Sequence, residues 1–235
     1  MSRSKYIGVL GIAFAVLWTA LAIAPWNRAD WLIENVLTVI AIVVLVLTRR
    51  SLPLSLVSYT TVFVFLSLHT IGSHYTYADV PYDAAFRSLT GVSLNEILGW
   101  ERNNFDRVVH FSYGLLLAYP IREMFLRVVK VRGFWGYFLP LDLTMSTSML
   151  YELIEWGAAL VVGGDLGMAY LGTQGDVWDA HKDMALASLG GLIAMLLTAA
   201  INWRLQRDFA REWVDSLRVH DPRPLGEEAI RRMMR

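Results

Sequence analysis

The chain has 235 residues, of which 55% are hydrophobic and 12% are aromatic. Soluble globular domains are typically about 45–50% apolar, so this composition favours a membrane protein. The formal net charge is zero, which gives no indication of a nucleic-acid partner. The chain has no cysteine, and this excludes a disulfide framework, a thiolate metal site and a cysteine nucleophile.

Six segments are apolar over the length of about 20 residues that a bilayer span needs. The first ends near Ala22-Ile23-Ala24, which resembles a signal-peptide cleavage site. Its apolar run of about 18 residues is longer than the roughly 7–15 of a signal-peptide core, so we expect an uncleaved anchor. The sequence predicts an all-α, polytopic membrane helix bundle, with a single transmembrane domain over residues 1–235 and its core at 54–203. The predicted spans are residues 6–24, 31–48, 54–72, 107–128, 136–162 and 184–203.

The distribution of Lys and Arg predicts the orientation of these spans. If the N-terminus is cytoplasmic, 16 of the 21 basic residues lie on the cytoplasmic side. The five left outside are Arg28, Arg87, Arg102, Arg107 and Lys182. The positive-inside rule therefore predicts that both termini face the cytoplasm, in a bacterial inner membrane.

Two segments outside the predicted spans have expected structures of their own. The external loop at 73–106 contains "SLNE" from Ser93 to Glu96, which has capping-box spacing and predicts a short helix. We expect the sixth span to continue past Arg204 as a solvated cytoplasmic helix within the tail at 204–235, and to fray by "DPRP".

Acids and histidines gather at the predicted outer ends of spans three to six. Asn103, Asp106 and His110 are spaced i, i+3, i+7, and Asp179 and Asp183 are spaced i, i+4, so each set shares a helix face. A charged side chain at mid-membrane costs roughly 2.5–3.5 kcal/mol on insertion scales, so we expect these groups to meet inside the bundle. The candidate polar site comprises His69, His74, Tyr75, Asp106, Arg107, His110, Glu152, Glu155, Asp176, Asp179 and Asp183.

Carboxylates and imidazoles together are ligands for divalent metals, and a bound metal would activate water or polarise a phosphoryl or carbonyl oxygen. The same residue types relay protons or bind ions in transporters. The candidate metal ligands are His74, Asp106, His110, Glu152, Asp179 and Asp183.

Structural roles are open for several of these residues. Asp106 suits the first turn of a helix because of the helix dipole, and Glu152 could pair with Arg107. His69 could be an interhelical hydrogen-bonding group. Asp176 could shape a turn, and His181 could point into solvent.

Four stretches resemble the YjdF-like family of bacterial inner-membrane proteins, a domain of unknown function. They are "HTIGSHYTYADVPY", "NNFDRVVHF" with "PIREMFLR", "YELIEWGAAL" and "YLGTQGDVWDAHKDM". The resemblance covers residues from about 50 to 200. The family commonly has Gln at the position of His181, which makes His181 a poor candidate for an obligatory ligand.

A weaker similarity is to VanZ-like membrane proteins. Asp106, Arg107 and His110 match the first signature of that group, and Glu152 with Glu155 match the second, with Glu in place of Gln. Asp179, Asp183 and Gly190 match the third, with Asp in place of Asn. These substitutions make the site more acidic and favour a cation.

The sequence therefore leaves three classes of function open. The leading hypothesis is an outward-facing acidic and histidine site that binds a divalent metal and acts on an envelope or lipid-linked small molecule. The alternatives are transport of an ion or small molecule, and a non-catalytic membrane scaffold. The one partner expected in every case is the lipid bilayer.

Overall fold

The computed structural model describes residues 1–163, 173–219 and 226–234, and over these residues it contains helices and no strand. The predicted all-α helix bundle is confirmed. The elements are α1 (Arg3–Leu21), α2 (Arg28–Thr48), α3 (Leu56–His74), α4 (Tyr82–Thr90), α5 (Leu94–Leu98), α6 (Phe105–Met124), the π-helical turn η1 (Phe125–Val129), α7 (Trp135–Val162), α9 (Asp179–Leu205), α10 (Phe209–Ser216) and α11 (Glu227–Met233).

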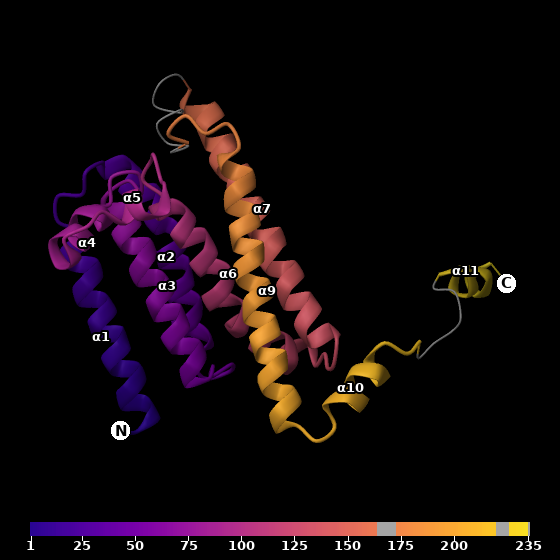
Figure 1. Ribbon diagram of the computed structural model, residues 1–235. Coiled ribbons are helices and arrows are strands. Elements are labelled where there is room, and N and C mark those ends of the chain that lie inside the picture. The colour runs from indigo at the N-terminus through magenta and orange to yellow at the C-terminus, as the bar shows by residue number, and fades with distance from the viewer. Residues whose placement is uncertain (164–172, 220–225, 235) are drawn as a thin grey trace.

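Four helices of the described chain, α1, α2, α3 and α9, are long and apolar enough to cross a membrane. They coincide with the predicted spans at 6–24, 31–48, 54–72 and 184–203. Helices α6 and α7 occupy the other two predicted segments and run alongside α9 in the bundle (Figure 1). Their status as spans, and the placement of both termini in the cytoplasm, stay predictions.

The long helices are arranged in a row with α6 near its middle. Helix α6 packs against α3 on one side and against α9 and α7 on the other, while α1 and α2 pack against α3 (Figure 1). The outer end of the bundle is defined here as the end at which α6 and α9 begin, which the basic residues predict to face outside. The inner end is the end at which α9 finishes and α10 begins.

The α6–α9 contact depends on glycines that let two backbones touch. A Cβ atom on Gly114 of α6 would lie 1.9 Å from the carbonyl oxygen of Ala187 on α9. A Cβ on Gly190 of α9 would lie 2.2 Å from the carbonyl oxygen of Phe111. Small residues are favoured at membrane helix interfaces for this reason. The close approach fixes the rotation of α6 and α9, and hence which side chains face each other at the outer end.

The predicted short helix in the external loop is confirmed as α5. The Ser93 hydroxyl accepts a hydrogen bond from the backbone N–H of Glu96 at 3.1 Å, as an N-cap does. The carboxylate of Asp83 on α4 accepts from the Ser93 hydroxyl and from the Asn95 backbone N–H, both at 2.9 Å. The hydrogen bond from the Asn95 backbone N–H contributes most to lowering the pKa of Asp83. Asp83 therefore ties α4 to α5.

The prediction of one helix running past Arg204 is wrong. Helix α9 ends at Leu205, and a separate helix, α10, begins at Phe209. The chain turns because Phe209 and Trp213 pack against Tyr137 near the start of α7, with ring centroids 6.1 and 5.6 Å away. The segment "DPRP", where fraying was expected, lies outside the described residues.

Candidate functional site

The outer ends of α6 and α9 carry a charged layer, called the rim, which consists of Arg102, Asp106, Arg107, Asp176, Asp179 and Lys182. Arg102 precedes α6, and its Nη2 lies 2.6 Å from Asp106 Oδ2 and 2.6 Å from Asp179 Oδ1. Its Nη1 donates to the backbone carbonyl of Thr173 at 2.7 Å. The Arg102 side chain is only 14% exposed, so one guanidinium holds two helices and a loop together with little competition from water.

The second half of the rim is built around Asp176, which lies in the loop before α9. Arg107 Nη2 and Lys182 Nζ each lie 2.5 Å from Asp176 Oδ2. Asp176 Oδ1 accepts from the backbone N–H of Trp178 at 3.1 Å. The Lys182 ammonium, with help from the Trp178 N–H and Arg107, lowers the pKa of Asp176 to about 2. Arg107 therefore pairs with Asp176, and the alternative of an Arg107–Glu152 bridge is not the arrangement found.

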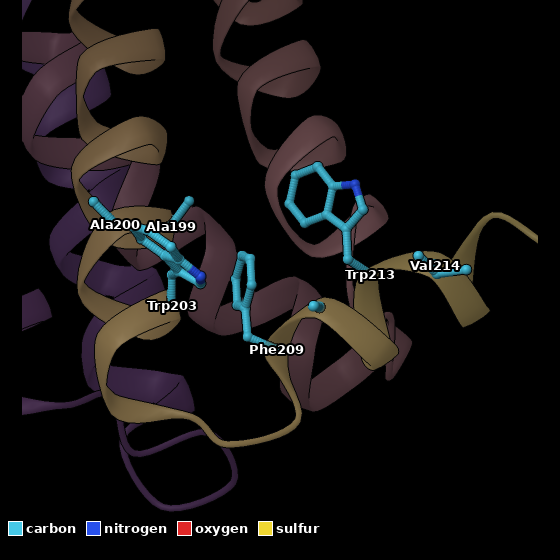
Figure 2. A pocket seen from close by; sticks show the side chains of 7 residues that line it. Ala199, Ala200, Trp203, Phe209, Trp213 and Val214 are labelled. Atoms are coloured by element: carbon cyan, nitrogen blue, oxygen red, sulfur yellow. The ribbon is translucent and has the colours of Figure 1, made fainter.

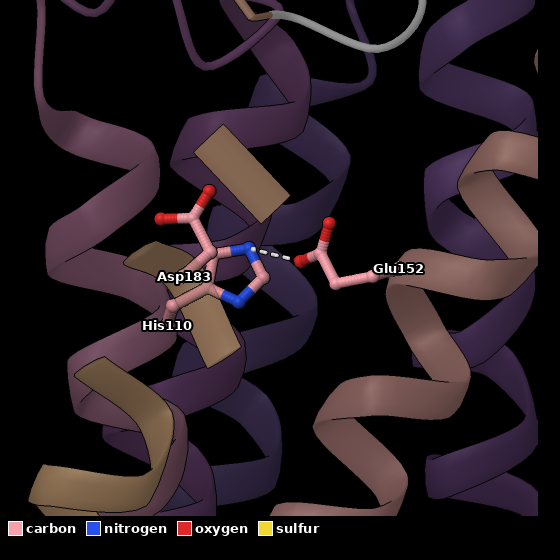
Figure 3. Close-up of side chains that lie close together, drawn as sticks. All are labelled: His110, Glu152 and Asp183. Carbon is pink, nitrogen blue, oxygen red and sulfur yellow. Dashed lines mark ion pairs between the residues drawn. The ribbon is translucent and has the colours of Figure 1, made fainter. Parts of the chain in front are cut away.

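One turn deeper lies a second layer, called the deep triad, which consists of His110 on α6, Glu152 on α7 and Asp183 on α9. One ligand atom from each of these residues lies within 4.8 Å of the other two. His110 Nε2 is 3.6 Å from Glu152 Oε1 (Figure 3). Asp183 also forms a second such group with Asp106 and Asp179 of the rim. Asp183 thus joins the two layers.

The deep triad leaves carboxylate oxygens without hydrogen-bond partners. Asp183 is 4% exposed, and its Oδ1 is buried with no partner. Glu152 Oε1 is also buried without a hydrogen bond, and so is the hydroxyl of Ser148, one turn earlier on α7. Buried polar groups in native structures are nearly always satisfied, and a bound cation or a shared proton would satisfy these atoms.

Ligand atoms of one metal ion, bound at about 2.0–2.2 Å, lie roughly 3–4 Å from each other. The 4.8 Å limit that encloses the deep triad is wider by about 1–2 Å, and side-chain movements of up to roughly 1 Å per residue would bring the ligand atoms to that spacing. An imidazole with two carboxylates is a mixed nitrogen and oxygen ligand set, which suits Zn, Fe or Mn better than Ca. The arrangement is chemically able to hold a divalent cation.

His69 forms hydrogen bonds between helices, which is the structural role that the sequence left open for it. Its Nδ1 lies 2.6 Å from the Tyr77 hydroxyl, and its Nε2 lies 3.1 Å from the backbone carbonyl of Glu34. The Glu34 carboxylate, on α2, accepts from the hydroxyls of Tyr151 at 3.0 Å and Tyr77 at 3.4 Å. These residues form a second buried polar group between α2, α3 and α7. Glu155, one turn beyond Tyr151 on α7, lies beside the Tyr151 hydroxyl.

His74 and Tyr75 lie away from both layers. His74 Nδ1 is 2.7 Å from the backbone carbonyl of Leu21, at the end of α1. The Tyr75 ring packs on His74, with centroids 4.5 Å apart, and on Trp26 at 5.8 Å. In the described chain neither residue belongs to a group of potential metal ligands, because His74 points from α3 towards α1 and not towards α6.

Two functional candidates were missed at the sequence level, although each left a signal. Arg102 stands four residues before Asp106, the spacing of a helical ion pair. Glu34 is the one acid within the apolar segment at 31–48, and an ionisable residue inside a span usually faces the bundle interior and has a function.

Comparison with known proteins places the chain in a family. Residues 6–204 match the family model described as "Predicted membrane protein (DUF2238)". The chain is 37% identical to the inner membrane protein YjdF of Escherichia coli (strain K12) over 188 residues, which are 80% of this chain and 86% of that protein. No solved structure matches the chain. The resemblance to YjdF-like proteins is confirmed, and the similarity to VanZ-like proteins stays a prediction.

Proposed function

The chain belongs to the DUF2238 family of predicted membrane proteins, and for this member we propose a divalent-cation site in the deep triad that serves chemistry on an envelope or lipid-linked substrate. The chain is a multi-pass protein of the bacterial inner membrane. The proposed ligands are His110, Glu152 and Asp183, which come from three different helices.

The observation that carries the proposal is the environment of the Asp183 side chain. Its carboxylate is buried, it has an unpartnered oxygen, and it faces an imidazole and a second carboxylate. An uncompensated buried charge destabilises a protein by several kcal/mol in order of magnitude. In the described chain the rim arginines pair with Asp106, Asp176 and Asp179, so the deep triad has no Lys or Arg of its own. A divalent cation would supply the missing positive charge.

A cation held there would have a defined chemical role. It would polarise a phosphoryl or carbonyl oxygen, or lower the pKa of a bound water so that the water becomes nucleophilic. The rim lies directly above, where Arg102 and Arg107 pair with the carboxylates of Asp106, Asp176 and Asp179 and hold the triad helices in place. The substrate would arrive at the outer surface, where lipid-linked envelope molecules are accessible.

Ion transport is the second candidate, and one observation favours it. The Tyr151 ring packs edge-on against His110, with centroids 6.0 Å apart, while its hydroxyl donates to buried Glu34 at 3.0 Å. Tyr151 therefore connects the deep triad to the polar group around His69. Such a line of exchangeable protons is typical of proton-coupled transporters. Proton flux into proteoliposomes, measured with a pH-sensitive dye, separates this candidate from the first.

Metal content of the purified protein tests the proposal directly. Protein in detergent is supplied in turn with Zn, Mn, Fe and Mg, desalted, and analysed for bound metal. We expect about one ion per chain for the parent, and at least about tenfold weaker binding for Asp183→Asn and His110→Gln, since each removes a ligand from a three-ligand set.

The matched control is Asp142→Asn, which makes the same chemical change at an exposed acid of α7. Circular dichroism and gel filtration show that each variant remains folded. The proposal fails if the parent binds none of the four metals, or if Asp142→Asn lowers the metal content as much as Asp183→Asn does.

A further inference from the structure

Two adjoining hollows are lined by residues at the inner end of the bundle, and they include no residue of the rim or the deep triad. Figure 1 shows α10 at this end, next to the last turns of α9. The hollows form where α10 turns back beneath α9 and α7, and Phe209 of α10 lines both. Helix α10 is fixed in this position by Ser216, whose hydroxyl accepts from the Phe134 backbone N–H at 2.9 Å. Trp135 Nε1 donates to the Ser216 carbonyl at 2.8 Å. The hollows are therefore part of the folded bundle.

The first hollow, of about 380 Å³, is basic. Arg122, Lys130 and Arg132 line it, with Glu212 as the single acid, so three positive charges face one negative charge. The Arg122 guanidinium carbon lies 4.5 Å from the centroid of the Tyr137 ring. Its Nε is buried and has no hydrogen-bond partner. A buried donor of this kind beside excess positive charge indicates an anion.

The second hollow, of about 460 Å³, is apolar. Figure 2 shows the aromatic rings of Trp203, Phe209 and Trp213 around it, from both α9 and α10. Ala199 and Ala200 leave room on the α9 side because their side chains are small. Ala210 and Val214 complete the lining, which contains no charged residue among those that the structure describes.

The length of α9 places the inner end of the bundle, and with it both hollows, at a membrane surface. Helix α9 is a candidate span of 27 residues, about 40 Å long at 1.5 Å per residue. The hydrocarbon core is about 30 Å thick, so the last turns of α9 reach the lipid headgroups. Trp203 is 69% exposed near this end, and tryptophan favours that depth.

We propose that the inner end binds one anionic phospholipid, with its phosphate in the basic hollow and an acyl chain in the apolar hollow. Basic pockets beside transmembrane helices are known to recognise anionic headgroups. A free phosphate would fill the basic hollow alone, and an apolar peptide would fill the apolar hollow alone. A phospholipid fills both, and their shared wall at Phe209 matches the junction of headgroup and chain. The proposal is independent of the cation site.

Lipid titration followed by native mass spectrometry tests it. The full chain in a mild detergent is titrated with dioleoyl-phosphatidylglycerol, or with the zwitterionic dioleoyl-phosphatidylcholine. We expect phosphatidylglycerol to bind at least about tenfold more tightly. Arg122→Gln should weaken phosphatidylglycerol binding about fivefold to tenfold, as expected for loss of one charge-assisted hydrogen bond. It should weaken phosphatidylcholine binding less, because the choline ammonium of that lipid offsets the charge of its phosphate. Ala200→Phe, which fills the apolar hollow, should weaken binding of both lipids.

The matched control is Arg50→Gln, which removes an exposed basic residue on the same predicted side, outside both hollows. If Arg122→Gln misfolds, Lys130→Gln and Arg132→Gln, both at exposed positions, carry the same expectation. Equal binding of the two lipids would overturn the proposal, and so would an equal effect of Arg50→Gln. Displacement of the lipid by millimolar inorganic phosphate would also overturn it, since that result identifies a free-anion site.

Discussion

The two layers at the outer end, the rim and the deep triad, lie about one turn of α9 apart and differ in charge balance. The rim has three carboxylates and three cationic side chains in mutual contact. The deep triad has two carboxylates and one imidazole, and one oxygen of each carboxylate is buried without a hydrogen bond. The charges of the rim balance within the described residues, whereas no Lys or Arg of that part of the chain pairs with the two carboxylates of the deep triad. The balanced layer and the proposed cation site are thus separated by one helical turn.

The largest expected effect comes from forcing α6 and α9 apart, which disrupts the rim and the deep triad together. Gly114→Ala places a Cβ 1.9 Å from a backbone oxygen of α9, so α6 and α9 must move apart. Overpacking typically costs about 1–3 kcal/mol, and a backbone clash belongs at the upper end, about 3 kcal/mol. Thermal unfolding in detergent measures the loss. Gly11→Ala on α1, where a Cβ meets nothing within 4 Å, should be neutral or slightly stabilising. Similar losses for both variants would contradict the close α6–α9 contact.

Breaking the rim alone should cost less. Arg102→Met leaves the carboxylates of Asp106 and Asp179 without their closest cation, and we expect a loss of about 2–3 kcal/mol in unfolding free energy, because the pairs are mostly buried. Arg87→Met is the matched control, since the Arg87–Glu96 pair is 55% and 73% exposed and should contribute about 0–1 kcal/mol. If the two variants unfold at the same temperature, the rim does not hold α6 to α9.

A pair of histidine variants should separate structural from ligand roles. His69→Gln disrupts buried contacts to Tyr77 and to the Glu34 backbone, so we expect a loss of about 1–2 kcal/mol with unchanged metal binding. His110→Gln should do the reverse, with weaker metal binding and a smaller loss of stability in metal-free protein. Differential scanning fluorimetry with and without metal measures both quantities. Loss of metal binding in His69→Gln would move the site towards α3.

The smallest effect concerns acid stability of the rim. The folded-state pKa of Asp176 is about 2, below its ordinary value of 3.8. A depressed pKa stabilises the fold fully above the ordinary value, and this stabilisation is lost as the pH falls towards 2. The melting-temperature difference between the parent and Asp176→Asn should therefore be constant from pH 7 to pH 5 and should shrink below pH 4. A difference that grows on acidification would show that Asp176 is not held ionised by Lys182 and Arg107.

Local features of the sequence were sufficient for the long helices and for the polar residues near their outer ends. Each apolar run predicts its own helix, because the length of a span is set by bilayer thickness. The cap at Ser93 predicted α5 from four residues. The rotation between His69 and His74 was overlooked. Five residues correspond to about 140° around a helix, so the two rings could not both face α6. The turn at Leu205 could not be predicted, because it depends on Phe209 and Trp213 meeting Tyr137 on a distant helix.

The sequence by itself determined the helical class, the membrane, and the gathering of acids and histidines at the outer ends of four segments. These follow from hydropathy and from the cost of charge in hydrocarbon, which act on each segment separately. Only the tertiary structure decided which residues are partners: Arg102 and Arg107 neutralise the rim, and His110, Glu152 and Asp183 remain uncompensated. The physical reason is that pairing depends on helix rotation, and rotation is set by interhelical contacts such as that of Gly114 with Ala187.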